Sequence, residues 1–243
     1  MSKADKKIVI AHLYPETMNL YGDTGNVIVL KKRLEWRNIQ VQVVNVGIGQ
    51  DIPQGTDIVF GGGGQDASQG MIEEDFIHKK KTLENMASDG VVMLFICGLY
   101  QLMGRKFTTH TGDVITGLGI LPIETVAKNK RLIGNIVINI KDVGKVVGYE
   151  NHSGQTFLDN EDDSLGQTLK GVGNNQMSGN EGCRYKNVFG TYLHGPVLAK
   201  SPEFADFLID LALSRKGKKL AEYKNLDDSL EKKASEIACA QPR

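Results

Sequence analysis

Short apolar runs alternate with amphipathic segments over the first part of the chain. The apolar runs end in turn-forming residues, which is typical of strands, whereas the segments between them repeat apolar side chains at helical spacing. Strands that alternate with helices over short connections predict an α/β fold with a parallel, doubly wound sheet. In the second helix we expect the lysines at 79–81 to face solvent. The predicted strands are residues 8–13, 41–46, 57–60 and 91–96, and the predicted helices are residues 25–38 and 71–88.

The pattern changes from residue 107 onward, where β-favouring residues are separated by turn signals. We expect antiparallel strands there that extend the edge of the mostly parallel sheet. Residues 159–182 contain many Gly, Asn and Asp residues and few large apolar ones, so they predict a long surface loop. A further strand is predicted at residues 188–193.

The end of the chain predicts one firm helix and a charged tail. Ser201 is expected to cap the helix, with Pro202 at its first position, and Gly217 marks its end. The sequence thus predicts one domain over residues 1–217 and a tail, helical or partly disordered, over residues 218–243. A thin apolar stripe in the tail suits either a solvated helix or a helix that docks on a partner. The stripe consists of Leu226, Leu230, Ala234 and Ile237.

The composition is that of an ordinary globular protein with balanced charge. Its 29 basic and 29 acidic side chains cancel, which argues against nucleic acid or an anionic membrane surface as a partner. No apolar run is long enough to span a bilayer, and the amino terminus lacks the core of a signal peptide. The three cysteines are widely spaced and form no CxxC pair, so we expect no disulfide framework, no metal site and a reduced, cytoplasmic compartment.

The strongest candidate for chemistry is the cysteine that ends the apolar run at residues 91–96. Cys97 is followed at once by Gly98 and a helix-like segment, so it lies at the carboxyl end of a buried strand, where active sites of open α/β folds gather. A sharp turn from strand to helix is the geometry of a nucleophile elbow, and the start of a helix favours thiolate. The alternative interpretation is that Cys97 is a small buried hydrophobe.

A cysteine nucleophile needs a base, and the chain has 5 histidines. His194 ends the strand at residues 188–193, so it too lies at the carboxyl end of a strand. If that strand neighbours the strand of Cys97, the imidazole and the thiol can meet within hydrogen-bond distance. His152 is the competing candidate. Of the others, we expect His78 and His110 to face solvent and His12 to lie in the core or a loop.

Four consecutive glycines follow the predicted strand at residues 57–60. Gly61 to Gly64 offer backbone N–H groups without side chains in the way, which suits the stabilisation of an oxyanion. A plain turn or a phosphate cradle is the alternative, although the segment lacks the lysine of a P-loop and does not match GxGxxG. Together with Cys97 and His194, the glycines complete the parts needed for acyl transfer.

Three segments of the chain resemble the active-site segments of class I glutamine amidotransferases. A histidine followed by Gly-Pro is similar to the cobyric-acid-synthase-like (CobB/CobQ) branch of that family. Further stretches at residues 19–26, 130–134 and 148–154 resemble the glutaminase subunits of lipid II isoglutaminyl synthases (GatD type), and the resemblance extends over roughly residues 8–217. The three segments are Gly61-Gly-Gly-Gly64, Ile96-Cys-Gly-Leu-Tyr-Gln101 and Gly190-Thr-Tyr-Leu-His-Gly195.

This resemblance implies a flavodoxin-like three-layer fold and the hydrolysis of L-glutamine to glutamate and ammonia. Arg131 is implied to anchor the substrate, since the guanidinium fork matches the two oxygens of a carboxylate. The other implied roles are nucleophile for Cys97, base and acid for His194, oxyanion donors for Gly62 or Gly63 and for Gly98, and support of the elbow for Gln101.

The resemblance also implies a partner. A Mur-ligase-like (MurT type) subunit would receive the ammonia and amidate the D-glutamate of the lipid II stem peptide to D-isoglutamine, a step of peptidoglycan synthesis. ATP and Mg²⁺ are expected on that partner, so this chain is expected to need no cofactor of its own.

Two positions depart from the family pattern. Leu99 replaces a glycine, which requires a backbone without positive φ there and would narrow the pocket. Pro196 stands where typical triads have an acid, so either a Cys–His dyad suffices or a carboxylate comes from elsewhere. Asp23 and a carboxylate on the partner are the candidates, while a cap or loop role explains Asp23 equally well. Two rival functions stay open: another hydrolase with a cysteine elbow, and a non-catalytic binding subunit.

Overall fold

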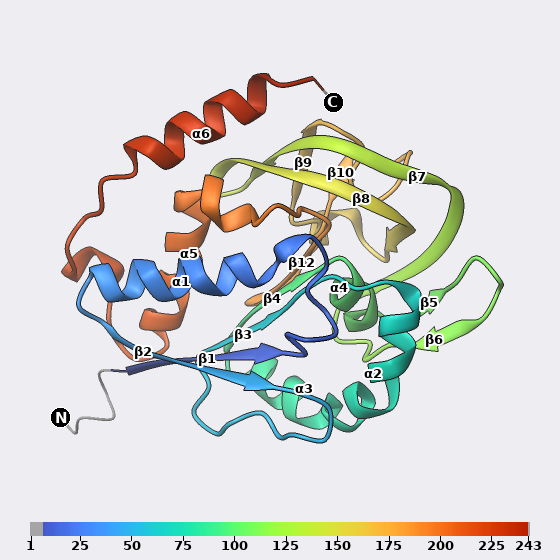
Figure 1. The fold of residues 1–243 in the computed structure, drawn as a ribbon, viewed down its shortest axis with the longest axis horizontal. Coiled ribbons are helices and arrows are strands. Elements are labelled where there is room, and N and C mark those ends of the chain that lie inside the picture. The colour runs from blue at the N-terminus through green and yellow to red at the C-terminus, as the bar shows by residue number, and fades with distance from the viewer. Residues whose placement is uncertain (1–6, 243) are drawn as a thin grey trace.

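The computed structural model describes residues 7–242 and contains a central sheet of six strands in the order β11-β12-β4-β3-β1-β2 (Figure 1). Neighbouring strands are parallel, except that β11 pairs antiparallel with β12 at one edge. The predicted parallel sheet with an antiparallel edge strand is therefore confirmed. The strands are β1 (Lys7–Leu13), β2 (Gln40–Val46), β3 (Ile58–Gly61), β4 (Val92–Ile96), β11 (Cys183–Tyr185) and β12 (Val188–Thr191).

The central strands are apolar because both of their faces are covered. Every residue of β3, β4 and β12 is buried, whereas the edge strand β2 has several exposed positions. Strands β4 and β12 are direct neighbours, with Ile96 opposite Thr191 in the register. Since both strands run in the same direction, the residues that follow them, including Cys97 and His194, emerge at the same edge of the sheet.

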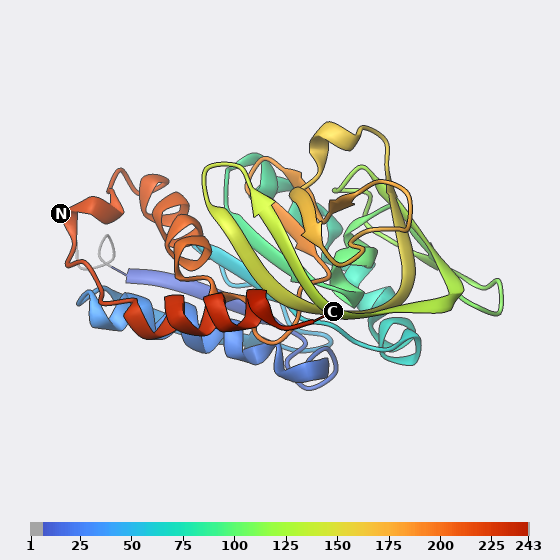
Figure 2. The same cartoon turned by 90° about the horizontal axis from the view of Figure 1, so that it is seen from above.

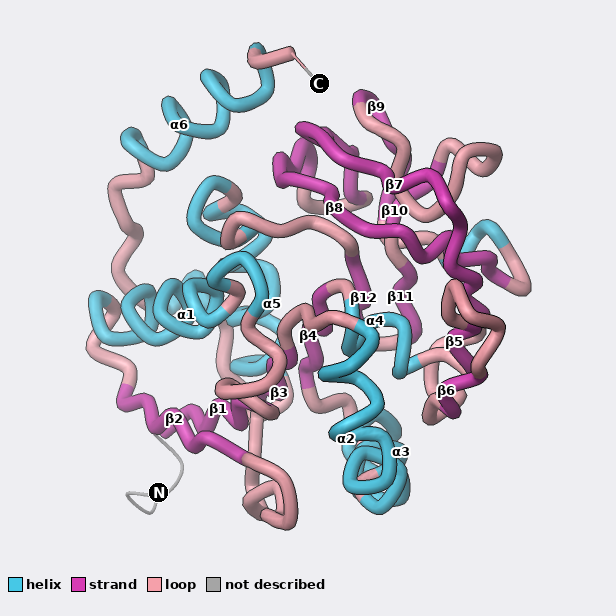
Figure 3. Tube along the Cα trace, turned by 45° about the vertical axis from the view of Figure 1, so that its right-hand side comes forward, coloured by secondary structure: helices cyan, strands magenta, loops and turns pink. Residues whose placement is uncertain are grey.

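Helices cover both faces of the central sheet and complete the three layers of a flavodoxin-like fold (Figure 3). Helices α1 and α5 lie on one face, and α2 and α3 lie on the other. No helix within residues 7–242 is long and apolar enough to cross a membrane. The helices of the three layers are α1 (Thr24–Trp36), α2 (Asp66–His78), α3 (Lys80–Ser88), α4 (Gly98–Met103) and α5 (Pro202–Ser214).

The segment predicted as one helix over residues 71–88 is in fact two, α2 and α3. Lys79 lies at the break between them and is buried, so the prediction that it faces solvent is wrong. Its Nζ donates to Asp75 Oδ2 at 2.5 Å and lies 5.5 Å from the centre of the Tyr14 ring. The aromatic ring and the carboxylate together make burial of this ammonium group possible.

The predicted start and end of α5 are only partly correct. Pro202 does occupy its first position, and Gly217 follows its end with a φ of +69°. The side chain of Ser201, however, makes no capping hydrogen bond, and its Oγ is buried without a partner among the described residues. Pro202, which lacks an N–H that needs a cap, thus marks the start of the helix.

Most of the strand-rich region after α4 forms a second six-stranded sheet instead of extending the edge of the first. Its order is β10-β9-β7-β5-β6, with β8 beside β7, and the long β7–β8 ribbon curves over one end of the molecule (Figure 1). Residues 159–182, predicted to be a surface loop, contribute β9 and β10 and bury Asn174, Asn175 and Glu181. The strands are β5 (Lys106–Thr108), β6 (Val114–Thr116), β7 (Ile123–Ile140), β8 (Gly144–Leu158), β9 (Gly166–Lys170) and β10 (Asn180–Glu181).

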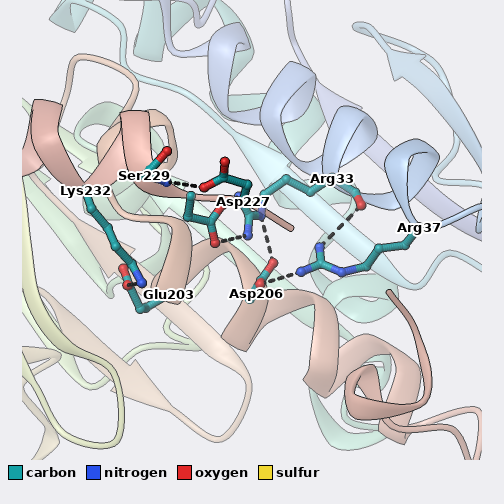
Figure 4. Close-up of polar contacts among 8 residues, drawn as sticks. Arg33, Arg37, Glu203, Asp206, Asp227, Ser229 and Lys232 are labelled. Carbon is teal, nitrogen blue, oxygen red and sulfur yellow. Dashed lines mark hydrogen bonds and ion pairs between the residues drawn. The ribbon is translucent and has the colours of Figure 1, made fainter. Parts of the chain in front are cut away.

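The tail contains a helix, α6 (Ser229–Ala240), that is fastened at both ends. Just before its start, Asp228 Oδ1 accepts a hydrogen bond of 2.6 Å from Nη1 of Arg33 in α1. The same buried guanidinium donates to Asp206 of α5 at 2.7 Å (Figure 4). Beyond the other end of α6, Asn135 of β7 donates to the backbone oxygen of Pro242 at 2.6 Å. The helix therefore links the α1–α5 layer to the second sheet (Figure 2).

The apolar stripe of the tail faces away from the rest of the molecule. Leu230 is 76% exposed and Ile237 is 53% exposed, and no residue of α6 is buried. The helix instead contacts the body of the protein through the sides of partly buried residues, such as Ser235 and Ala238. The tail is thus held by polar contacts at the two ends of α6, by an ion pair of 3.6 Å between Lys232 and Glu203, and by Leu220 and Tyr223, which pack against the core.

Candidate active site

Cys97 occupies the corner between β4 and α4, as predicted. Its φ of 49° and ψ of −100° lie outside the regions that most residues adopt, which is the strained backbone of a nucleophile elbow. Two backbone hydrogen bonds fix this corner. The Cys97 N–H donates to Thr191 O at 2.8 Å, and the Cys97 carbonyl accepts from the Gln101 N–H at 2.9 Å. The neighbouring strand and the first turn of the helix thus hold the thiol in place.

Leu99, the first departure from the family pattern, points into the core. It is fully buried, has no positive φ, and does not line the cavity that contains Cys97. A Cβ on Gly61 would lie only 2.4 Å from Leu99 Cδ1, so glycine at position 61 makes room for this leucine. The expectation that Leu99 narrows the pocket is therefore wrong.

His194 lies shortly beyond the end of β12 at Thr191 and is held by the second sheet. Its N–H donates to Tyr149 O at 2.9 Å, and its carbonyl accepts from the Tyr149 N–H at 3.1 Å, so β8 fixes its backbone. Its Nδ1 lies 3.1 Å from Asp23 Oδ1, and both side chains are buried. The ring of Tyr21 packs edge-on against the imidazole, with 4.8 Å between the ring centres.

Gly63 shows how closely the thiol and the imidazole converge. A Cβ on Gly63 would lie 2.8 Å from His194 Cε1 and 3.2 Å from Cys97 Cβ. The two side chains therefore border the same point, which only a glycine leaves open. His194 Nε2 is buried and has no hydrogen-bond partner among the described residues. Because Nδ1 is committed to Asp23, Nε2 is the nitrogen that is available to act on the thiol and its substrate.

The surroundings of His194 favour its charged form. Burial opposes a charge on the ring, but Asp23 and the side chain of Cys97 outweigh burial and raise the pKa of His194 from 6.5 to about 10. A carboxylate, an imidazole and a thiol in sequence are the arrangement of a nucleophilic triad. Asp23 directly precedes α1, and the first turn of α1 is tied to the segment after His194, where the Leu198 N–H donates to Asn26 Oδ1 at 3.0 Å.

The glycine segment supplies its free N–H group one residue later than predicted. The Gly63 N–H donates to Asp23 Oδ2 at 2.8 Å, so this donor is occupied. Neither Gly62 nor Gly63 lines the cavity, whereas Gly64 does. A Cβ on Gly98 would lie 2.9 Å from Gly64 N, which places the two backbones side by side next to Cys97. Gly98 does not itself line the cavity, but it directly follows Cys97 and its backbone lies against that of Gly64, so we expect these two N–H groups to donate to an oxyanion.

A cavity of about 320 Å³ opens beside Cys97 and contains most of the remaining predicted site residues. Arg131 lies in its wall, where Nη2 donates to Asn151 Oδ1 at 2.8 Å, and the Asn151 amide in turn donates to Tyr21 Oη at 2.7 Å. Gln101 also lines the cavity, and its side chain donates to Tyr192 Oη at 3.1 Å. The other lining residues are Leu20, Gly64, Gln65, Asp66, Ala67, Gln69, His110, His152 and Ser153.

The other histidines do not meet the requirements of a base. His152 reaches the cavity, but burial lowers its pKa to about 3, and its ring stacks on Tyr192 at 3.6 Å. His12 is buried in β1, with its pKa lowered to about 4 by burial. His78 and His110 are exposed, as predicted, although His110 lies at the rim of the cavity. His194 alone combines a charged partner with proximity to Cys97 in the described structure.

Two features of the site were missed by sequence reasoning. Glu181 is fully buried and holds the segment before His194, since it accepts from the Tyr192 N–H at 2.6 Å and from Thr191 Oγ1 at 2.8 Å. Gln69 lines the cavity and donates to Gln101 Oε1 at 2.9 Å. Glu181 lies in a polar segment that looks like a loop, and Gln69 gives no signal that sets it apart from other helical glutamines.

An elbow cysteine, a buried histidine and a glycine segment on a flavodoxin-like sheet define a class I glutamine amidotransferase. The profile of the CobB/CobQ-like glutamine amidotransferase domain matches residues 9–202, and the chain belongs to that family. It is 40% identical to the lipid II isoglutaminyl synthase (glutamine-hydrolyzing) subunit GatD of Staphylococcus aureus, over 95% of this chain and 94% of that protein. The GatD subunit of Streptococcus pneumoniae is 41% identical over 85% of this chain and 81% of that protein.

The fold is also shared with more distant proteins. A glutamine amidotransferase from Thermotoga maritima superimposes with a TM-score of 0.54, covering 95% of this chain and 93% of that one. The two sequences are only 14% identical, so this likeness concerns the arrangement of the chain alone. It agrees with the flavodoxin-like architecture predicted from the sequence.

Proposed function

We propose that this protein hydrolyses L-glutamine to glutamate and ammonia and delivers the ammonia to a partner ligase that amidates lipid II. The observation that carries the glutaminase proposal is the convergence of Cys97 and His194 on Gly63 beside a cavity that contains Arg131. The naming of two similar proteins as subunits of a glutamine-hydrolysing lipid II isoglutaminyl synthase supports the acceptor.

In the first half of the proposed reaction, the thiolate of Cys97 attacks the side-chain carboxamide carbon of glutamine. The carbonyl oxygen becomes an oxyanion, which the N–H groups of Gly64 and Gly98 stabilise. The C–N bond then breaks, and the proton on His194 Nε2 passes to the departing nitrogen, which leaves as ammonia. The product is a thioester between Cys97 and the γ-carbonyl of the substrate.

In the second half, water attacks the thioester carbonyl and His194 takes its proton. The C–S bond breaks, the γ-carboxyl group of glutamate forms and releases its proton to solvent, and the thiolate of Cys97 is regenerated beside the protonated imidazole. Asp23 acts on His194 throughout, because its carboxylate fixes the N–H on Nδ1 and stabilises the imidazolium. Arg131 anchors the α-carboxylate of the substrate, and Gln101 supports the elbow through its backbone and side chain.

The ammonia is then used by a Mur-ligase-like (MurT type) subunit. Amidation of the D-glutamate α-carboxyl needs its activation by ATP and Mg²⁺, which belong to the partner in this proposal. Lipid II would bind through the partner, and this chain would act in the cytoplasm, where the ATP is found. The product would be the D-isoglutamine of the peptidoglycan stem peptide.

The test is glutaminase activity measured as glutamate release with the partner ligase present. Cys97→Ala and His194→Ala are each expected to abolish turnover, whereas Cys183→Ala, which removes a buried thiol outside the cavity, should retain it. Retained turnover in either of the first two variants would refute the assignment of Cys97 as nucleophile and His194 as base and acid. Alkylation by a glutamine-mimicking electrophile, followed by intact mass, separates the rivals: no labelling of Cys97 would favour a non-catalytic subunit.

A further inference from the structure

The catalytic cavity contains two buried hydrogen-bond acceptors that receive no donor. His152 Nε2 and Gln69 Oε1 are both inaccessible to solvent and have no partner within the described residues. Both residues line the cavity beside Cys97. Buried polar atoms without partners are rare in native proteins because each one costs free energy. Two of them in one cavity indicate that a ligand with N–H groups completes the site.

The hydrogen bond of His152 determines which ring nitrogen carries the proton. Its Nδ1 lies 2.6 Å from the carbonyl oxygen of Gly154, and a carbonyl can only accept, so the hydrogen resides on Nδ1. Nε2 therefore carries the lone pair of a residue that lines the cavity. The ring cannot turn easily, because it is stacked on Tyr192 with only 3° between the ring planes. Burial lowers the pKa of His152 to about 3, so the ring stays neutral and remains an acceptor.

Gln69 is oriented in the same way. Its Nε2 donates to Gln101 Oε1, and the Gln101 Nε2 donates in turn to Tyr192 Oη at 3.1 Å. In this arrangement Gln69 presents its oxygen, and not its nitrogen, as the free atom of its amide. The two acceptors are thus oriented before any ligand arrives.

The position of His152 beside Arg131 indicates which donor group the two acceptors receive. His152 directly follows Asn151, whose side chain binds the Arg131 guanidinium, and it pairs in the sheet with Leu132. A glutamine anchored by its α-carboxylate on Arg131 brings its α-ammonium to this part of the cavity. An ammonium carries three N–H donors and suits neutral acceptors, while Arg131 and His194 repel it from their own positions.

We propose that His152 Nε2 and Gln69 Oε1 form the acceptor pair that binds the α-ammonium of L-glutamine, an inference that rests on the glutaminase function proposed above. The pair selects free α-amino acids against amides that lack the amino group. An analogue without that group leaves both acceptors buried and unpaired, and such sites reject the analogue strongly.

The experiment compares L-glutamine with 5-amino-5-oxopentanoate, which is glutamine without its α-amino group. Binding of each is measured by NMR titration to the Cys97→Ala chain, which cannot turn the ligand over, with and without His152→Phe. Phenylalanine keeps the stack on Tyr192 and removes the acceptor. The preference for glutamine should fall at least about tenfold, because a hydrogen bond to a charged group contributes roughly 1.5–3 kcal/mol. His78→Phe, at an exposed histidine outside the cavity, should leave the preference unchanged.

The outcomes separate this inference from the proposed function. If Cys97→Ala does not bind glutamine at all, the glutaminase proposal and the inference fall together. If glutamine binds but His152→Phe keeps its full preference, or weakens both ligands equally, only the acceptor pair is refuted. Gln69→Leu provides a second test, with the same expected loss of preference, should His152→Phe prove unfolded by circular dichroism.

Discussion

The role of Asp23 can be tested by exchanging its carboxylate for an amide. In Asp23→Asn, the amide oxygen can still accept from the Gly63 N–H, which now donates to Asp23 Oδ2 at 2.8 Å. The amide nitrogen would then face His194 Nδ1 and donate to it. The imidazole must therefore adopt the tautomer with its lone pair on Nδ1 and its hydrogen on Nε2. The nitrogen that should take a proton from the thiol would then carry one already.

The structure sets the scale of the effect. The rise in the pKa of His194 from 6.5 to about 10 corresponds to roughly 5 kcal/mol in favour of the protonated ring, shared between Asp23 and Cys97. Loss of the carboxylate and of the correct tautomer should lower kcat/KM by roughly 100- to 10,000-fold. Without the Asp23 carboxylate, burial should lower the pKa of His194. The alkaline limb of the pH profile of glutaminase activity should therefore move to lower pH.

The assay is glutamate release across pH with the partner ligase present. Asp57→Asn is the matched control, because Asp57 is a buried carboxylate outside the cavity, with an ion pair of 3.1 Å to Lys216. Asp57→Asn should change the free energy of unfolding but leave the pH profile of glutamate release where it is in the wild type. If Asp23→Asn keeps activity within about threefold of the wild type and an unchanged alkaline limb, the triad reasoning is refuted.

Three further predictions concern the anchor, a buried acid and the tail. Arg131→Lys should raise the KM for glutamine about tenfold or more with little change in kcat, because lysine cannot form the two-pronged contact; a change in kcat alone would contradict this. Burial raises the pKa of Glu181 from 4.5 to about 8, so the folded state holds its proton more tightly between these values. The free energy of unfolding, from urea titrations, should therefore fall in the wild type as the pH rises through this window, relative to Glu181→Gln; parallel curves would disprove it. Asp228→Asn removes one of the two carboxylates on buried Arg33 and should cost about 1.5–3 kcal/mol. It should also speed hydrogen exchange in α6, and unchanged exchange would argue against the tail being fastened there.

The pairing of Cys97 with His194 was predictable because it follows from a simple rule. Parallel neighbouring strands end at the same edge; Cys97 directly follows β4, and His194 comes shortly after the end of β12. Asp23 could only be one candidate among several, since it is separated from His194 by 171 residues and lies in a loop that no periodicity describes. The sequence could not show that the Gly63 N–H, one of the predicted oxyanion donors, is occupied by Asp23.

The second sheet shows a different limit of sequence reasoning. β-favouring residues between turn signals predicted strands in this region, but such a pattern does not specify which partner or which sheet a strand joins. Glu181 shows the same limit for a single side chain. Its glycine- and asparagine-rich surroundings are typical of exposed loops, and its burial depends on partners in β12 that only the folded chain brings near.

The strand order has a consequence for the protein while it is being made. Strand β4 is apolar throughout, and in the finished sheet it lies between β3 and β12. Its second neighbour, Val188–Thr191, leaves the ribosome only after the whole second sheet has been synthesised. Until then, the chain carries an unpaired apolar edge, the kind of surface that recruits other chains or chaperones. The arrival of β12 closes that edge and brings His194 to Cys97 in the same step, so a nascent chain with an exposed edge has no working catalytic pair.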